Sequence, residues 1–347
     1  MRTVRPLAAV VLIALLGTSS LQAWAQGERR GFFERRAASQ DAAADDGGLA
    51  GEFGSGSCAE RDRQVQRLMR SPLGARLQGP DPDLRDVAYG SKPRQRLDVF
   101  LPKGGNKPAP VIVMVHGGGW CVGDKNAAGV TRAKSAHWGR QGFVFVSVNY
   151  PMITDGSRAL QQAADVARAV AFVQQHAADW GGDGQRVILV GHSAGAHLVS
   201  LVNADARLRK EHGVGPIVGV VSLDSGATNT VTQMQKAMPR MKARYEEAFG
   251  SSEDGWIHAS PYHQLDRSAA PWLGVCSTRR ADAPCEQARQ YADKSNALGV
   301  KAAVLPVDKG HGAINKETGE AGAMTDEIDR FLGALDPALQ ARLARRP

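Results

Sequence analysis

The chain has 347 residues, of which 43% are hydrophobic and 22% are charged. This is the composition of an ordinary globular protein, and it excludes both a largely disordered chain and a polytopic membrane protein. The 43 lysines and arginines outnumber the 35 acidic residues, giving a formal net charge of +8, but the basic residues are scattered. Because no basic block is long enough to mark a nucleic-acid groove, we expect no nucleic-acid partner.

Residues 1–25 have the pattern of a secretory signal peptide. Arg2 and Arg5 precede an apolar run from Pro6 to Gly17, and Ala23-Trp24-Ala25 supplies the small-x-small pattern read by signal peptidase. Twelve apolar residues are too few to cross a hydrocarbon core about 30 Å thick. We therefore predict cleavage after residue 25, no stable membrane anchor afterwards, and an exported protein, either periplasmic or secreted.

The following segment, residues 26–57, is rich in Gly, Ala, Asp, Glu and Arg, and its large apolar residues are Phe32, Phe33, Leu49 and Phe53. So few apolar side chains cannot bury enough surface to offset the entropy lost on ordering. The composition predicts a disordered linker over 26–57, followed by one folded domain over 58–347.

Within that domain, runs typical of strands alternate with runs typical of helices. Continuous β-branched and aromatic runs predict four buried strands, at 111–115, 143–148, 187–190 and 218–223. The alternating run at 96–101 predicts a half-exposed strand. Between 160 and 171, Leu, Ala and Val recur at helical spacing. This alternation predicts an α/β fold, with an open, mostly parallel sheet covered by helices on both faces.

Two glycine-rich motifs follow predicted strands, where ligands bind in such sheets. Gly191-His192-Ser193-Ala194-Gly195 lies between the strand at 187–190 and an apolar helical segment. A serine on a tight strand-to-helix turn projects its hydroxyl from the sheet edge, and the helix N-terminus behind it favours developing negative charge. This context predicts that Ser193 is a nucleophile.

The second motif, His116-Gly117-Gly118-Gly119-Trp120, follows the strand at 111–115. Consecutive glycines are costly in conformational entropy, and an oxyanion hole explains them because backbone N–H groups must converge there without intervening side chains. We expect Gly118, Gly119 and Ala194 to supply these donors. We expect His116 to organise the loop, and Trp120 to line the substrate site.

Together these motifs resemble those of α/β-hydrolase-fold esterases with an H-G-G-G-W oxyanion loop, related to the hormone-sensitive-lipase and bacterial carboxylesterase families. The specific stretches are H-G-G-G-W-x-x-G-D-K at 116–125, S-V-N-Y at 147–150 and G-H-S-A-G-A-H at 191–197. The resemblance implies an α/β-hydrolase fold, with a small helical insertion near 225–270. It also implies a carboxylesterase that cleaves small-molecule esters through an acyl-enzyme, with no cofactor and no metal.

The resemblance places the catalytic base late in the chain, after the acid. His311, between two glycines and after a predicted strand at 301–307, fits the base. For the acid we expect Asp282, in the loop that follows a strand at 272–275. The His-Gly that family members show at that strand end is Cys-Ser here, so Glu286 and Asp224 remain alternatives. Asp308 is expected to act as a strand-end or salt-bridging residue.

Two other function classes remain open from the sequence. An amidase or formamidase uses the same triad, and an H-G-G-x-W loop also occurs in relatives of formamidases. A catalytically degenerate binding protein with the same fold is the third reading, and the intact serine, histidine and glycine loop argue against it.

Four cysteines in an exported chain permit three complete pairings. Cys276 and Cys285 flank the loop that holds Asp282, so we predict a disulfide between them. The remaining pair, Cys58 and Cys121, would then join the start of the domain to the oxyanion loop.

Overall fold

The structure is a computed structural model that describes residues 56–103, 108–237 and 239–344. The predicted signal peptide and all but the last two residues of the predicted linker lie outside these residues. At the end of that linker, the Ser57 side chain accepts a hydrogen bond from the backbone N–H of Glu60 and begins a helix.

Eight strands form one sheet with the order β1-β2-β4-β3-β5-β6-β7-β8. The strands are β1 (Leu84–Ala88), β2 (Arg96–Phe100), β3 (Ala109–Val115), β4 (Val144–Val148), β5 (Gly182–His192), β6 (Ile217–Leu223), β7 (Trp272–Ser277) and β8 (Ala302–Val307). The pairs β1·β2 and β2·β4 are antiparallel, and the pairs from β4 through β3 to β8 are parallel. The predicted mostly parallel α/β-hydrolase sheet is confirmed.

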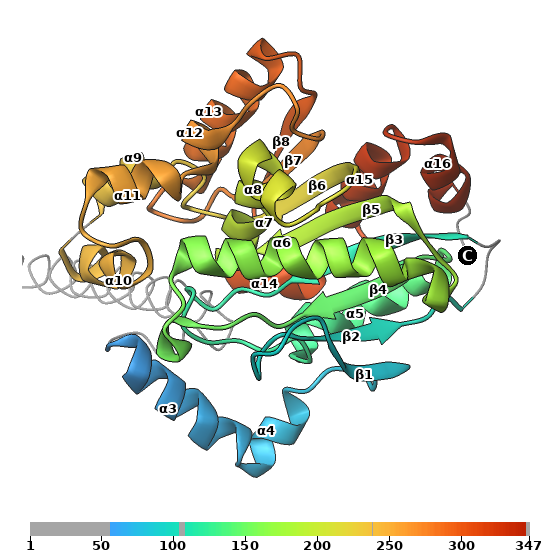
Figure 1. The fold of residues 1–347 in the computed structure, drawn as a ribbon, viewed down its shortest axis with the longest axis horizontal. Coiled ribbons are helices and arrows are strands. Elements are labelled where there is room, and N and C mark those ends of the chain that lie inside the picture. Colours follow the sequence, from blue (N-terminus) through green and yellow to red (C-terminus); the bar gives the residue numbers. More distant parts are fainter. Residues whose placement is uncertain (1–55, 104–107, 238, 345–347) are drawn as a thin grey trace, which may run out of the picture. The chain divides into compact units, whose positions relative to one another are not determined.

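The α-helices of the described residues are α3 (Cys58–Met69), α4 (Pro72–Arg76), α5 (Ala128–Arg140), α6 (Ala159–His176), α7 (Ala194–Ala204), α8 (Ala206–Glu211), α9 (Thr230–Lys236), α10 (Pro239–Phe249), α11 (Glu253–His258), α12 (Pro261–Gln264), α13 (Pro284–Ala297), α14 (His311–Glu317), α15 (Ala323–Gly333) and α16 (Pro337–Leu343). Short 3₁₀ helices occupy Ile153–Asp155 and Ala177–Trp180. Figure 1 shows α6 running across one face of the sheet, with α5 and α14 behind it.

The central strands are buried on both faces, as their continuous apolar runs predict. All seven residues of β3 are buried, and they alternate between two clusters. Val111, Val113 and Val115 pack with residues of α6 and α7, whereas Ile112 and Met114 pack with residues of α5, α14, α15 and α16. Each such aliphatic side chain contributes about 1.5–3 kcal/mol relative to leaving it exposed. The core thus fixes the carboxyl ends of the strands, where the motifs lie.

The insertion between β6 and β7 is helical, as predicted, and consists of α9 to α12. Two details differ from the sequence expectations. β1 was not expected, because four of its five residues are exposed and show no alternation. Leu160 of α6 is 39% exposed and does not join the buried face of the helix. Among the described residues, no helix is both long and apolar enough to span a membrane.

Candidate active site

Ser193 lies on a sharp turn between β5 and α7. Its backbone has φ 55° and ψ −118°, a conformation that costs a non-glycine residue of order 1–3 kcal/mol and that persists only where the surroundings impose it. Here the turn is fixed on both sides, because the Ser193 N–H donates to Leu223 O at 2.9 Å and the His197 N–H donates to Ser193 O at 3.1 Å. Residue 195 must be glycine, since a Cβ there would collide with the backbone of Val115 and His116.

The glycine loop after β3 lies directly against this turn. A Cβ on Gly117 would lie 2.9 Å from both Ser193 Cβ and His192 O, so only glycine allows this approach. Gly118 and Gly119 have φ of +117° and +60°. Within the described residues, no hydrogen bond occupies the backbone N–H of Gly118, Gly119 or Ala194. These are the three N–H groups that the sequence analysis expects as oxyanion donors.

The other motif residues hold the glycine loop in place. The Tyr150 hydroxyl donates to His116 O at 2.8 Å, and the two rings stack with centroids 4.7 Å apart. Asn149 Oδ1 lies 3.0 Å from His116 Nε2 and accepts the Lys125 N–H at 2.7 Å. Burial lowers the pKa of His116 to about 4, so the ring is neutral near pH 7. These contacts give His116 the organising position that the sequence analysis expects.

His311 begins α14, after the carboxyl end of β8, and its Nδ1 lies 2.6 Å from Asp224 Oδ2. Asp224 follows β6 with φ 56° and is completely buried. Its other oxygen accepts the backbone N–H of Ser277 at 2.8 Å. Burial raises the pKa of this carboxyl group, but the hydrogen bond from His311 and the charge of Arg280 outweigh burial, so the pKa lies well below its ordinary value. Asp224 therefore faces the imidazole as a carboxylate.

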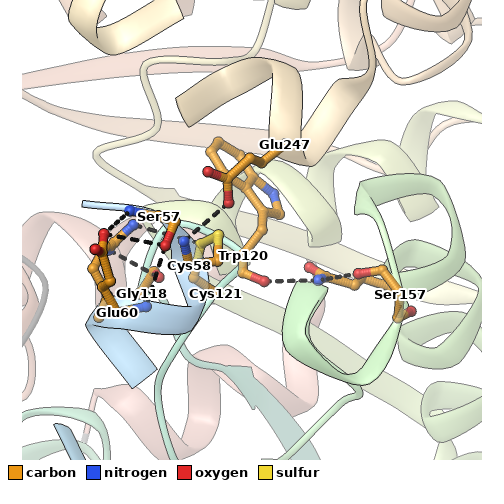
Figure 2. Close-up of a disulfide and its surroundings, with 10 residues drawn as sticks. Ser57, Cys58, Glu60, Gly118, Trp120, Cys121, Ser157 and Glu247 are labelled. Atoms are coloured by element: carbon orange, nitrogen blue, oxygen red, sulfur yellow. Dashed lines mark hydrogen bonds between the residues drawn. A yellow bond between two sulfur atoms is a disulfide. The ribbon is translucent and has the colours of Figure 1, made fainter. Parts of the chain in front are cut away.

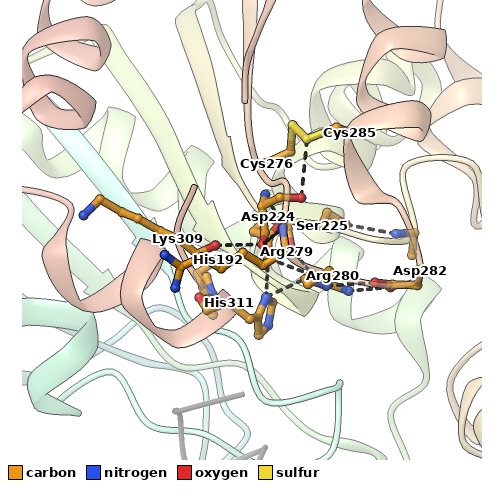
Figure 3. A network of polar contacts seen from close by, with 12 residues as sticks. His192, Asp224, Ser225, Cys276, Arg279, Arg280, Asp282, Cys285, Lys309 and His311 are labelled. Carbon is orange, nitrogen blue, oxygen red and sulfur yellow. Dashed lines mark hydrogen bonds and ion pairs between the residues drawn. A yellow bond between two sulfur atoms is a disulfide. The ribbon is translucent and has the colours of Figure 1, made fainter. Parts of the chain in front are cut away.

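Asp282, the expected acid, does not contact His311 in this geometry. Its two oxygens accept from Arg280 Nε at 2.9 Å and Nη2 at 2.5 Å (Figure 3). Glu286 lies 3.6 Å from Lys236, and its side chain is 54% exposed. The structure thus brings His311 to Asp224, the alternative at the end of the preceding strand, and not to either carboxylate of the later segment. The physical reason is that Asp282 already neutralises the arginine two residues before it.

Arg280 is a site residue that sequence reasoning missed. Its Nη1 lies 2.9 Å from Asp224 Oδ2 and 3.0 Å from His311 Nδ1. Burial lowers the pKa of Arg280, but the charges of Asp224 and Asp282 raise it by more, so the pKa lies above its ordinary value. A permanent cation therefore adjoins Asp224 and His311. The paired arginines at 279 and 280 mark a basic loop, but nothing in the sequence indicates that one of them turns inward.

Two histidines beside Ser193 are buried and act in packing. His192 Nε2 donates to His311 O at 3.1 Å, and the two rings lie 4.5 Å apart. This contact joins the serine turn to the first residue of α14. No hydrogen bond links Ser193 Oγ to His311 in the described residues; in free enzymes this bond is often long and tightens with substrate. His197 Nε2 donates to Ala259 O at 2.7 Å, and its Nδ1 accepts from Trp120 Nε1 at 3.3 Å.

Trp120 is only 5% exposed and lies in an aromatic cluster. Its ring meets those of Phe249 and Tyr245 edge-on, at centroid distances of 4.7 and 6.0 Å. The side chain therefore packs α10 against the glycine loop, and little of its surface is left to line an open substrate site.

The structure contains both predicted disulfides, Cys276–Cys285 and Cys58–Cys121. Within the described residues, the one group of three side chains spaced to hold a metal ion is Cys58, Cys121 and Glu247. The two sulfur atoms are bonded to each other and cannot serve as thiolate ligands, so this group does not fit a metal.

A model of the BD-FAE family matches residues 97–294, more than half of the chain. The chain belongs to the BD-FAE family. The matched segment contains the serine turn, the glycine loop, Asp224 and Arg280, but it excludes α3 and His311.

Three curated relatives resemble this BD-FAE protein over part of its length. It is 33% identical to a probable isoprenylcysteine alpha-carbonyl methylesterase of Arabidopsis thaliana over 134 residues. This match covers 39% of this chain and 27% of the methylesterase. Esterase LipC of Mycobacterium tuberculosis is 28% identical over 226 residues, covering 62% of this chain and 55% of LipC. Kynurenine formamidase of Danio rerio is 34% identical over 119 residues, covering 34% of this chain and 38% of the formamidase. The matches span between about a quarter and about half of these relatives.

Solved structures share the fold of this BD-FAE protein. Esterase Est2 of the planctomycete Thermogutta terrifontis superposes with a TM-score of 0.61, at 22% sequence identity, over 75% of this chain and 96% of Est2. At this identity the likeness concerns the fold.

Proposed function

We propose that this BD-FAE protein is an exported serine hydrolase that cleaves carboxylic esters through an acyl-enzyme. One observation carries the proposal: a strained serine, three unoccupied backbone N–H groups and a histidine–carboxylate pair meet at the carboxyl ends of β3, β5, β6 and β8. In this assignment Ser193 is the nucleophile, His311 the base and Asp224 the acid. Relatives named as esterases support the reaction class.

In the first half-reaction, Ser193 Oγ attacks the acyl carbon while its proton moves to His311 Nε2. The carbonyl oxygen becomes an oxyanion that accepts hydrogen bonds from the N–H groups of Gly118, Gly119 and Ala194. Asp224 holds the Nδ1–H of the imidazole and stabilises its positive charge. When the tetrahedral intermediate collapses, the ester C–O bond breaks and the leaving alcohol takes the proton from Nε2.

The second half-reaction repeats these steps with water. His311 removes a proton from the water molecule as its oxygen attacks the acyl carbon of the acyl-serine. The second tetrahedral intermediate uses the same three donors. Its collapse breaks the bond to Ser193 Oγ, which recovers a proton from His311, and the carboxylic acid leaves. Each oxyanion donor is worth on the order of 10²–10³ in turnover.

Export is part of the proposal and rests on two features. The first is the signal-peptide pattern of residues 1–25. The second is that all four cysteines are paired in disulfides, which persist in oxidising compartments. Cleavage at the predicted site would leave Gln26 as the first residue.

The test is hydrolysis of small aryl acetates by the purified protein and by Ser193→Ala. We expect turnover by the wild type and a loss of at least about a thousandfold in the variant, with an unchanged melting temperature. Unchanged turnover in Ser193→Ala would contradict the assignment. No turnover of any ester or anilide by folded wild-type protein would favour a degenerate binding protein.

An amidase or formamidase is the second candidate, and the similarity to a kynurenine formamidase favours it. The same triad serves both reactions, so geometry does not separate them. Matched pairs of aryl esters and anilides with the same acyl group, together with an N-formyl aniline, distinguish the two. We expect kcat/KM to be greater for the ester in each pair; a greater value for the N-formyl compound would favour the second candidate.

A further inference from the structure

Helix α3 precedes the segment matched by the family model and is attached to the oxyanion loop. The disulfide Cys58–Cys121 joins its first residue to the residue that follows Trp120. The Cys58 N–H donates to Glu247 of α10 at 3.0 Å, so α10 also holds the start of the helix (Figure 2). One turn further on is Arg61, whose side chain is buried; the residue is 1% exposed, whereas Arg63 and Arg67 of the same helix are exposed.

The guanidinium of Arg61 lies against the glycine loop. Its Nη2 donates to Gly118 O at 3.4 Å and its Nη1 to Cys121 Sγ at 3.5 Å. A Cβ on Gly119 would lie 3.2 Å from each of these nitrogens. No hydrogen bond in the described part of the chain satisfies Arg61 Nε. Burial lowers the pKa of Arg61 to about 10, so the group is still a cation at neutral pH.

Burying an arginine with so few hydrogen-bond partners is costly, and the negative charge of Glu247 on α10 offsets part of that cost. The position of the guanidinium against the glycine loop suggests a second role. Gly118 C=O and Gly119 N–H belong to the same peptide unit. Gly118 O also accepts the N–H groups of Cys121 and Val122, both at 3.2 Å. Donors that converge on a carbonyl oxygen polarise the peptide, and a polarised peptide has a stronger N–H donor at its other end.

We propose that Arg61 is a positioning residue of the oxyanion hole, which fixes and polarises the Gly118–Gly119 peptide from behind so that Gly119 N–H binds the oxyanion more strongly. The inference rests on the proposed serine-hydrolase function and extends the machinery to a helix outside the family match. Arg61 touches neither the substrate nor the reacting atoms. It therefore acts on the tetrahedral states and leaves binding of the ground-state ester unchanged.

The test compares Arg61→Met with the wild type and with Arg67→Met, an exposed arginine of the same helix. Turnover of an aryl acetate is divided by the number of active sites titrated with a fluorophosphonate, so that unfolded protein does not count. Inhibition by an aryl trifluoromethyl ketone is measured in parallel, because its adduct with the serine carries an oxyanion. For Arg61→Met we expect kcat to fall about tenfold and the inhibition constant to rise about tenfold, a smaller effect than losing a whole donor.

KM should stay within about twofold in every variant, a pattern that marks an interaction made only in the transition state. Arg61→Lys, which keeps the charge, should recover part of the loss, and Arg67→Met should match the wild type. Unchanged kcat per titrated site in Arg61→Met, or an unchanged inhibition constant, would overturn the proposal. If Arg61→Met does not fold, Arg61→Gln replaces it, since the shorter, uncharged amide removes the guanidinium from behind the peptide; wild-type kcat in that variant would also overturn the proposal.

The outcome also separates this inference from the proposed function. Wild-type protein that fluorophosphonate does not label, or Ser193→Ala that it still labels, refutes the nucleophile itself. Normal labelling at Ser193 with wild-type kinetics in Arg61→Met refutes only the role of Arg61.

Discussion

At the residue scale, two aspartates near His311 differ in the group that each one faces. Asp224 is fully buried, and its Oδ2 lies 2.6 Å from the imidazole Nδ1. The Asp282 side chain is 34% exposed, and its contacts are to Arg280. A catalytic acid must hold the imidazole in one tautomer, so the contact with Nδ1 is the reason that we propose Asp224 as the acid.

We predict that Asp224→Asn lowers kcat on an aryl acetate by on the order of 10³–10⁴, the loss typical when an amide replaces the triad carboxylate. Asp282→Asn is the matched control, because it makes the same chemical change in a residue that contacts Arg280 and not His311. Its loss should not exceed about tenfold, reflecting a less firmly held Arg280. A loss in Asp282→Asn equal to that in Asp224→Asn would contradict our assignment.

The lowered pKa of Asp224 also predicts how stability depends on pH. A carboxyl group whose pKa is lower in the folded than in the unfolded state stabilises the fold above its unfolded pKa of about 4. That contribution is lost as the pH falls from about 4 through the folded pKa, where the group becomes protonated. The difference in melting temperature between the wild type and Asp224→Asn should therefore shrink as the pH falls from 5 to below 4. Thermal melts across this range measure it, and a difference that grows in acid would contradict the reasoning.

At the scale of elements, the loop between β7 and α13 supports the acid–base pair. The disulfide Cys276–Cys285 closes this loop, and Arg280 reaches from it to Asp224 and His311. The loop was expected to carry the acid; in the structure it carries Arg280, which contacts Asp224, the residue that we propose as the acid. Its role in turnover should accordingly be smaller than that of the triad.

We predict that the double variant Cys276→Ala, Cys285→Ala lowers kcat by about tenfold because a less restrained Arg280 loosens the pair. KM should change little. A ring of this size contributes about 2.5 kcal/mol in the loop-entropy model, so the melting temperature should fall as well. Kinetics per titrated active site measure the first effect and calorimetry the second. Unchanged kcat with a lower melting temperature would show that the disulfide serves stability alone.

What the sequence predicts depends on how local the signal is. The buried strands follow from continuous β-branched runs, and the serine turn and glycine loop follow from glycines directly after such strands. The partner of His311 is not local: Asp224 follows β6, whereas Asp282 lies in the loop after β7 and Glu286 in α13. Which of them contacts His311 depends on how the strands pack side by side. The burial of Arg61 is equally hard to predict, because the sequence of α3 gives no sign of which of its arginines packs against the domain.

At the scale of the whole molecule, the sequence of residues 26–55 contains few large apolar side chains. We predict that deleting residues 26–55 from a chain that begins at residue 26, which keeps the helix cap at Ser57, changes the melting temperature by less than about 2 °C. Turnover on a small ester should also stay the same, because α3 and its disulfide remain. Calorimetry and steady-state kinetics of the truncated protein test this. A loss of several degrees, or of most activity, would show that this segment packs on the domain.

The central claim is that Ser193 is a nucleophile activated by His311 and Asp224. Its most direct test is mass spectrometry of the protein after reaction with a fluorophosphonate. The account predicts one phosphonyl group per chain, located on the peptide that contains Ser193, formed far more slowly in Asp224→Asn and absent in Ser193→Ala. A stoichiometric adduct on any other residue, or no adduct on folded wild-type protein, would contradict the account.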